Sequence, residues 1–155
     1  MSSGDCLAVA PIAEELKAFT IAYDCGTPRL FADNPDAQYM FRTGLDASVD
    51  NIGAVRYLKA TRPDVTRLSG IQQNYSWGQY SWADFTAAAA ILLPETEIVD
   101  EQVQKIYQCQ YGAEIDAMSV KRPQLVNSSF SGGDIEPVLL HANSLGTLAS
   151  DTGSQ

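Results

Sequence analysis

Several residue types are scarce in this chain of 155 residues, and each scarcity argues against a class of function. Basic side chains are few, with 10 Lys and Arg against 19 Asp and Glu. The resulting net charge of −9 argues against binding to nucleic acid or to an anionic membrane surface. No apolar run approaches the roughly 20 residues that a membrane-spanning helix needs. The longest run, 87–93, predicts a buried helix instead.

Histidine and cysteine are also sparse, which argues against most kinds of metal site and of catalytic nucleophile. The single histidine, His141, is expected in mid-helix with no cysteine or carboxylate at ligand spacing, so it predicts a surface or half-buried residue. Cys6, Cys25 and Cys109 show no Cys-x-x-Cys spacing and predict buried or idle thiols, with a Cys6–Cys25 bridge as the alternative. The sequence holds no phosphate loop, dinucleotide fingerprint or nucleophile elbow. We therefore expect no enzyme, no cofactor and no metal site.

Hydrophobic periodicity alternates between helix and strand along most of the chain. Helices are expected over 8–16, 48–60, 82–92, 111–120 and 134–145, and short strands over 19–22, 39–42, 65–71, 97–103 and 125–129. Asp46 is a candidate N-cap. This spacing predicts an α/β fold in which alternating βα units form a mainly parallel, three-layer helix/sheet/helix lobe.

The two ends of the chain interrupt this pattern. The sequence opens on what reads as a strand-to-helix loop, and it stops after a helix with no strand to follow. The lobe is therefore expected to be incomplete at both ends, with unprotected sheet edges. The small, polar tail 147–155 is expected to fray.

The polar and aromatic stretch 72–85 is the most informative segment. The hydrophobic run 68–71 enters it as a strand, and an amphipathic helix is expected to begin at Trp82. Open α/β sheets bind ligands at the carboxyl ends of their strands. Trp77 lies in this predicted loop with no obvious core to pack into. The pattern predicts a small-molecule site with an aromatic wall.

A series of motifs along the chain resembles one family. They are Ser2-Ser3-Gly4, the run 8–17, Phe41-Arg42-Thr43-Gly44, the segment 70–82, Tyr111 with Ile115, and the run from Arg122-Pro123 to Gly132-Gly133-Asp134. The chain resembles the type I periplasmic substrate-binding proteins, in the subgroup of leucine/isoleucine/valine receptors of ABC transporters. No single motif is unique to this family, but their collinear order carries the resemblance up to about Gly146.

This resemblance implies two α/β lobes that are joined by hinge crossovers and close on a ligand. Residues 1–44 would be part of the first lobe, with the crossover near Gly44-Leu45-Asp46. Residues 45–146 would be most of the second lobe, followed by the flexible tail 147–155. Because family members are longer, the chain is expected to be a fragment of such a receptor or a truncated gene product.

The resemblance also implies ligand contacts from the first lobe. Ser2 and Ser3, before a helix, would grip a ligand carboxylate, with plain N-capping as the alternative. Thr27 is the preferred contact in the loop after the strand 19–22, which corresponds to the second strand of the family fold. Asp24 would pair with an ammonium group if the ligand carries one. Simple turn chemistry is the alternative for both.

The contacts implied for the second lobe are aromatic and polar. Trp77 would cover the ligand, with Tyr75 as the reserve candidate; the alternative is a hinge or surface aromatic. Ser131 and Asp134 lie in a glycine-containing loop between a strand and a helix. They would contribute a polar contact, or form a tight turn in which Asp134 is the N-cap.

The function implied is the substrate-binding component, or a fragment of it, of an ABC importer for branched-chain or other small amino acids or amides. Its partners would be that ligand and the transporter permease. The intact parent would be periplasmic, although this chain shows no signal peptide of its own. The alternatives are a cytoplasmic sensor of the same fold, and a truncated domain without independent binding that self-associates through open sheet edges. A monomer is expected to bind weakly, since the polar groups of such a site come from both lobes.

Overall fold

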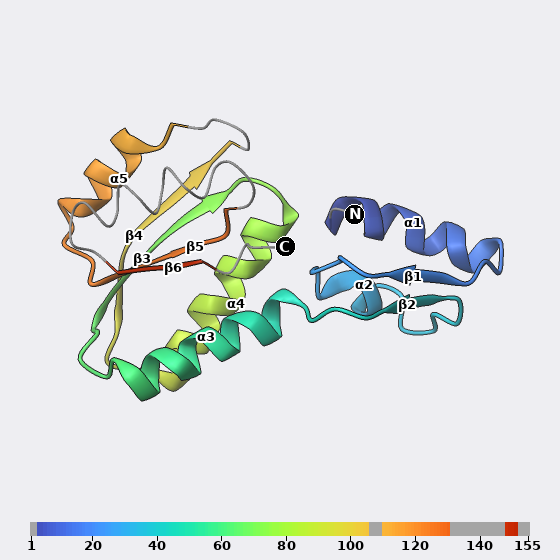
Figure 1. Cartoon of the computed structure of the whole chain (residues 1–155), viewed down its shortest axis with the longest axis horizontal. Helices are drawn as coiled ribbons and strands as arrows, with labels where there is room; N and C mark the ends of the chain where they lie inside the picture. Colours follow the sequence, from blue (N-terminus) through green and yellow to red (C-terminus); the bar gives the residue numbers. More distant parts are fainter. Residues whose placement is uncertain (1–2, 106–109, 131–147, 152–155) are drawn as a thin grey trace.

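A computed structural model describes residues 3–105, 110–130 and 148–151, the last as backbone only. It shows two α/β units placed end to end and joined by one connection (Figure 1). The first unit contains α1 (Ser3–Glu15), β1 (Thr20–Ala22), α2 (Arg29–Ala32) and β2 (Met40–Arg42). The second contains α3 (Ala47–Thr61), β3 (Arg67–Gln73), α4 (Ser76–Leu92), β4 (Glu97–Gln104), α5 (Gly112–Ser119), β5 (Leu125–Ser128) and β6 (Leu148–Asp151).

The second unit is built on a four-stranded parallel sheet of order β4-β3-β5-β6. Helices α3 and α4 cover one face and α5 covers the other (Figure 1). The inner strand β3 contributes side chains to the hydrophobic cores on both faces of the sheet, because Leu68 packs with α3 and α4 while Ile71 packs with α5. The predicted fold, a mainly parallel sheet between two helical layers, is therefore confirmed.

A close approach between helix and sheet fixes α4 on its face of the sheet. The Trp82 ring lies against Gly70 in the middle of β3, where a Cβ would come within 2.5 Å of a ring carbon. Trp82 also stacks on Phe85, with ring centroids 5.9 Å apart. Glycine at position 70 thus gives this large aromatic a flat place on the sheet.

The first unit has a two-stranded parallel sheet, β1 beside β2, packed against its helices. Its core holds Cys6 and Ala10 of α1, Ala22 of β1 and Leu30 of α2. The other face of this sheet is exposed, and on it the rings of Phe19 and Phe41 lie 5.1 Å apart.

Several helix and strand boundaries differ from expectation; β3, expected over 65–71, runs from Arg67 to Gln73. Helix α4 begins at Ser76, six residues before the predicted start at Trp82, and α1 begins at Ser3. The short helix α2 was not predicted. The predicted helix 134–145 lies outside the described residues.

The expectation that no strand follows the last predicted helix is wrong, because Leu148–Asp151 form β6. This strand pairs in parallel with β5, from Leu125↔Leu148 to Ser128↔Asp151. Its small and polar residues carry little strand signal of their own. Pairing with the edge of β5 supplies the backbone partners that local sequence does not reveal.

Within the described ranges, none of the helices combines the length and the apolar character needed to cross a membrane. Nor does any group of three or more His, Cys, Asp or Glu side chains in that part of the chain lie close enough together to hold a metal ion.

Candidate functional site

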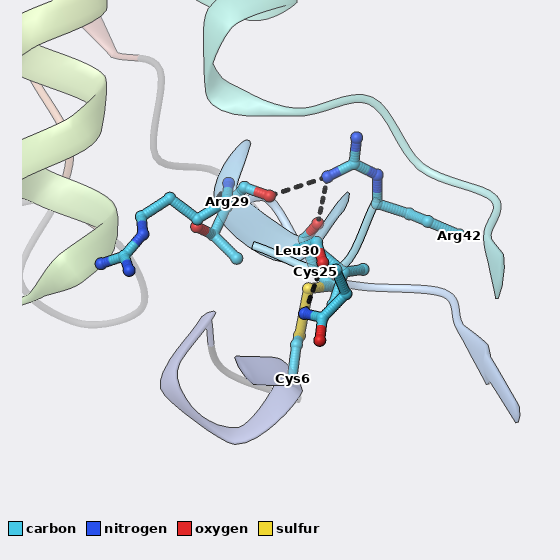
Figure 2. Close-up of a disulfide and its surroundings, with 7 residues drawn as sticks. Cys6, Cys25, Arg29, Leu30 and Arg42 are labelled. Atoms are coloured by element: carbon cyan, nitrogen blue, oxygen red, sulfur yellow. Dashed lines mark hydrogen bonds between the residues drawn. A yellow bond between two sulfur atoms is a disulfide. The ribbon is translucent and has the colours of Figure 1, made fainter. Parts of the chain in front are cut away.

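The candidate site centres on a loop at the carboxyl end of β1, formed by Cys25, Gly26 and Thr27 and here called the 25–27 loop. All three residues are buried. Cys25 forms a disulfide with Cys6 of α1, across a Cα–Cα distance of 6.2 Å (Figure 2). The prediction of idle thiols is therefore wrong for this pair. Both side chains lie in the core of the first unit, where α1 packs over β1. Cys109 lies outside the described residues.

Arg42, at the end of β2, holds the 25–27 loop from one side. Its guanidinium donates to the carbonyl oxygens of Cys25 at 3.3 Å and Thr27 at 2.9 Å (Figure 2). It also donates to a carboxylate oxygen of Asp46 at 2.8 Å. The carbonyl between them, that of Gly26, accepts from the backbone N–H of Ala47 at 2.9 Å. All three loop carbonyls are thus hydrogen-bonded.

These carbonyl contacts set the direction of the loop amides. In a planar trans peptide the N–H points opposite to the preceding C=O. The N–H of Gly26 therefore points away from Arg42, and that of Thr27 points away from Ala47. The Thr27 hydroxyl oxygen accepts from the backbone N–H of Arg29 at 3.3 Å. An ordered loop with oriented amides and a hydroxyl is suited to holding a carboxylate or another small anion.

Trp77, in the first turn of α4, packs onto this loop from the second unit. A Cβ at Gly26 would come within 1.8 Å of Cζ3 of the indole. Only 4% of the Trp77 surface is exposed, so the expectation that it has no core to pack into is wrong. The structure thus brings two of the predicted residues, Thr27 and Trp77, to one place, where the two units meet.

A second contact links the two units beside the loop. Arg29 at the start of α2 donates to the Tyr80 hydroxyl on α4 at 2.9 Å. In Figure 2 its side chain extends away from the disulfide and toward α4. Hydrogen bonds that its guanidinium donates to the Tyr80 hydroxyl and to the Asp33 carboxylate raise the pKa of Arg29, so this cation is charged at every ordinary pH. Tyr75, the reserve aromatic, is half-buried and is the N-cap residue of α4.

The other predicted contacts are placed less closely or not at all. Ser3 is buried and lies one turn before Cys6 on α1, hence on the helix face that the disulfide ties to the loop. Asp24 is half-buried and directly precedes the loop. Ser2, Ser131 and Asp134 lie outside the described residues.

A buried polar edge at the ends of β3 and β5 was not predicted. The Gln72 amide donates to the side-chain oxygen of Asn127 at 3.1 Å and to its carbonyl at 3.2 Å. The Ser129 hydroxyl is fully buried and has no hydrogen-bond partner in the described part of the chain. It lies beneath the first turn of α4, 3.0 Å from where a Cβ of Gly78 would be. The polar pairs at 72–73 and 127–128, inside strands, are the signal that could have identified this edge.

Two α/β units that meet at the carboxyl ends of their first strands have the layout of a bilobal α/β binding protein. The sequence matches the family described as "Periplasmic binding protein" over residues 1–152, and the chain belongs to that family. This finding confirms the resemblance seen in the sequence. No curated protein matches the sequence significantly.

Solved structures of solute-binding proteins share the fold at low identity. One from R. palustris, solved with benzoate, superposes with a TM-score of 0.83 at 19% identity, over 97% of this chain and 41% of that one. One from Rhodopseudomonas palustris BisB5, solved with 3,4-dihydroxybenzoic acid, gives 0.82 at 17% identity, over 98% and 41%. An amino acid ABC transporter substrate-binding protein from Pseudomonas fluorescens Pf-5 gives 0.78 at 16% identity, over 94% and 38%. This chain therefore spans about two fifths of the length of the structures it matches.

Proposed function

We propose that this chain carries part of the ligand site of a solute-binding protein that serves an ABC importer. One observation carries the proposal: Trp77 of the second unit packs onto the 25–27 loop of the first. A ligand at this place would contact both units at once. Family membership and the shared fold of transporter solute-binding proteins support the same reading.

The mechanism we propose is capture between two lobes. The amides of Gly26 and Thr27, with the Thr27 hydroxyl, would hold the anionic end of the ligand, and the indole of Trp77 would cover its apolar body. Because only the closed arrangement presents both sets of groups, the ligand shifts the population toward closure. Closure would then be the signal that a transporter permease reads.

The ligand we propose is a small carboxylate with an apolar body. Small amino acids and amides are the class expected from the sequence. Two of the structures above were solved with benzoate and a dihydroxybenzoate, and another is named an amino acid transporter protein. An indole wall and an anion-binding loop suit an aromatic carboxylate as well as a branched amino acid. Asp24 would favour the amino acid by pairing with its ammonium group.

The disulfide favours a periplasmic receptor over a cytoplasmic sensor of the same fold. Cys6 and Cys25 are joined within the core of the first unit. Structural disulfides persist in oxidising compartments such as the bacterial periplasm and are rare in the cytosol. We therefore place the protein to which these residues belong in the periplasm, next to its permease.

A thermal-shift screen against leucine, small amides and benzoate tests the proposal, with size-exclusion chromatography to define the species measured. A ligand at 100 times its Kd stabilises the folded state by about 2.7 kcal/mol, so a saturable rise of several degrees in Tm is expected for one class. A Trp77→Leu variant should lose that rise. A Tyr57→Leu variant, altered at an exposed position on α3, should keep it. A cooperative melt that none of these compounds shifts at millimolar concentration would contradict the proposed function.

A further inference from the structure

The guanidinium of Arg42 occupies a junction between the 25–27 loop and the connection between the two units. One nitrogen, Nη1, donates to the carbonyls of Cys25 and Thr27, and the other, Nη2, donates to Asp46. The charge centre of this guanidinium lies 5.5 Å from the centroid of the Phe31 ring, so the ring face restricts its movement as well. One side chain thus ties together α2, the loop and the start of α3.

Asp46 carries this connection into the second unit. Its other carboxylate oxygen accepts from the backbone N–H of Val49 at 3.2 Å and caps α3. The side chains of Arg42 and Asp46 are only 12% and 20% exposed, so their ion pair is largely screened from water. Charge-assisted hydrogen bonds are shorter and stronger than bonds between neutral groups, and this pair loses less to solvent screening than an exposed ion pair does.

We infer that Arg42 is a positioning residue for ligand binding: it fixes the orientation of the 25–27 loop and couples it to the crossover into α3. This inference rests on the proposed function, because it assigns to the loop amides the role of holding the ligand. Arg42 itself lies on the carbonyl side of the loop and makes no contact with the ligand. It acts by keeping the carbonyls of Cys25 and Thr27 turned toward it, which directs the Gly26 N–H to the opposite side.

Lysine cannot replace this arrangement. Arginine presents a planar fork of donors, and here that fork spans two carbonyls and a carboxylate at once. The ammonium of lysine is a compact point charge and would satisfy fewer of them. Arg42→Lys should therefore behave as an intermediate between the wild type and Arg42→Gln.

Amide hydrogen exchange, followed residue by residue by NMR, tests the inference without any ligand. In Arg42→Gln the amides of Ala47 and Arg29, which donate to the Gly26 carbonyl and to the Thr27 hydroxyl, should exchange at least about tenfold faster, with a smaller increase in Arg42→Lys. Arg62→Gln is the matched control, since Arg62 forms an exposed ion pair with Asp64 at the far end of α3. That variant should leave both amides unchanged.

Binding of benzoate and of leucine, measured well below the Tm of each variant, supplies the second readout. Loss of Arg42 should lower the affinity for whichever probe binds by about tenfold, the equivalent of one charge-assisted hydrogen bond. A purely structural Arg42 would lower Tm and leave this affinity unchanged. If neither probe binds the wild type, the proposed function fails, whereas the exchange rates still decide the role of Arg42.

If Arg42→Gln does not fold, Asp46→Asn provides a second test of the inference. Asparagine is as good an N-cap as aspartate, so α3 remains capped while the ion pair is lost. Faster exchange of the Arg29 and Ala47 amides, which donate to the 25–27 loop, is expected in Asp46→Asn as in Arg42→Lys. Unchanged exchange at Ala47 and Arg29 in folded Arg42 variants, or unchanged affinity for a probe that does bind, would overturn the inference.

Discussion

Gly26 is the position at which a single methyl group tests the contact between the two units. A Cβ there would lie 1.8, 2.6 and 2.7 Å from three carbons of the Trp77 ring. The ring is only 4% exposed and lies against the loop. The backbone at Gly26 is not in the left-handed region, so the effect of Gly26→Ala is steric. Overpacking of this kind costs about 1–3 kcal/mol.

Urea unfolding measures this cost directly. Gly26→Ala should lower the free energy of unfolding by about 2 kcal/mol, in the middle of the range for overpacked sites. Gly53→Ala is the matched control, because Gly53 is exposed in the middle of α3 and a Cβ there would meet nothing within 4 Å. That change should instead raise the free energy of unfolding by about 0.5–1 kcal/mol, through the better helix propensity of alanine.

A double-mutant cycle then assigns the cost to Trp77. Replacing Trp77 with leucine removes the ring atoms that clash with the new methyl group, so Gly26→Ala should cost at least about 1 kcal/mol less in the Trp77→Leu background. Additive effects would show that the two residues are not in contact. A neutral Gly26→Ala would likewise refute the packing of the second unit onto the 25–27 loop.

Two further predictions concern the first unit. The Glu14 carboxylate accepts backbone N–H bonds from Gln38, Tyr39 and Met40 at 2.9, 2.8 and 2.9 Å, and these bonds, that of Gln38 foremost, lower the pKa of Glu14 below 4.5. Because the pKa of Glu14 is lower in the folded state, its carboxylate stabilises the fold fully above pH 4.5, and this stability is lost as the pH falls through the folded-state pKa. Glu14→Gln should therefore be less stable than wild type at neutral pH, and the difference between their urea midpoints should close on acidification. A difference that does not depend on pH would contradict this. The Cys6–Cys25 bridge spans 19 residues of sequence, so a Cys6→Ala/Cys25→Ala double variant should lose about 3 kcal/mol in the same assay, and equal stability with wild type would exclude the bridge.

The layered fold was predictable because most of its elements carry strong local signals. The helix expected over 48–60 is α3, and Asp46 caps it as predicted, accepting from Val49. The start of α4 was misplaced because Trp77, Gly78 and Ser81 are buried on that helix although two of the three are not large apolar residues. Trp77 faces the first unit, Gly78 faces the polar edge of the sheet, and Ser81 faces α3, where Asn51 donates to its hydroxyl. Burial of these residues therefore breaks the apolar periodicity on which the prediction rested.

The site was predictable only in part, since its geometry depends on contacts between distant segments. Thr27 and Trp77 were candidates from the sequence, and their convergence rests on the space that Gly26 leaves for the indole. The importance of Arg42 was not apparent, because its partners lie 15 and 17 residues before it and four residues after it. The disulfide required α1 to extend back to Ser3, before any periodic pattern begins.

The central claim is that the ligand binds where Trp77 meets the 25–27 loop. Titration of ¹⁵N-labelled protein with benzoate and with leucine, followed by NMR, tests it most directly and detects even millimolar affinities. The account predicts saturable shifts at the amides of Gly26 and Thr27 and at the indole N–H of Trp77. The indole of Trp82, which packs on Gly70 in the core, should stay unchanged as an internal control. Saturable shifts confined to other surfaces, such as the exposed sheet face at Phe19 and Phe41, would contradict the claim.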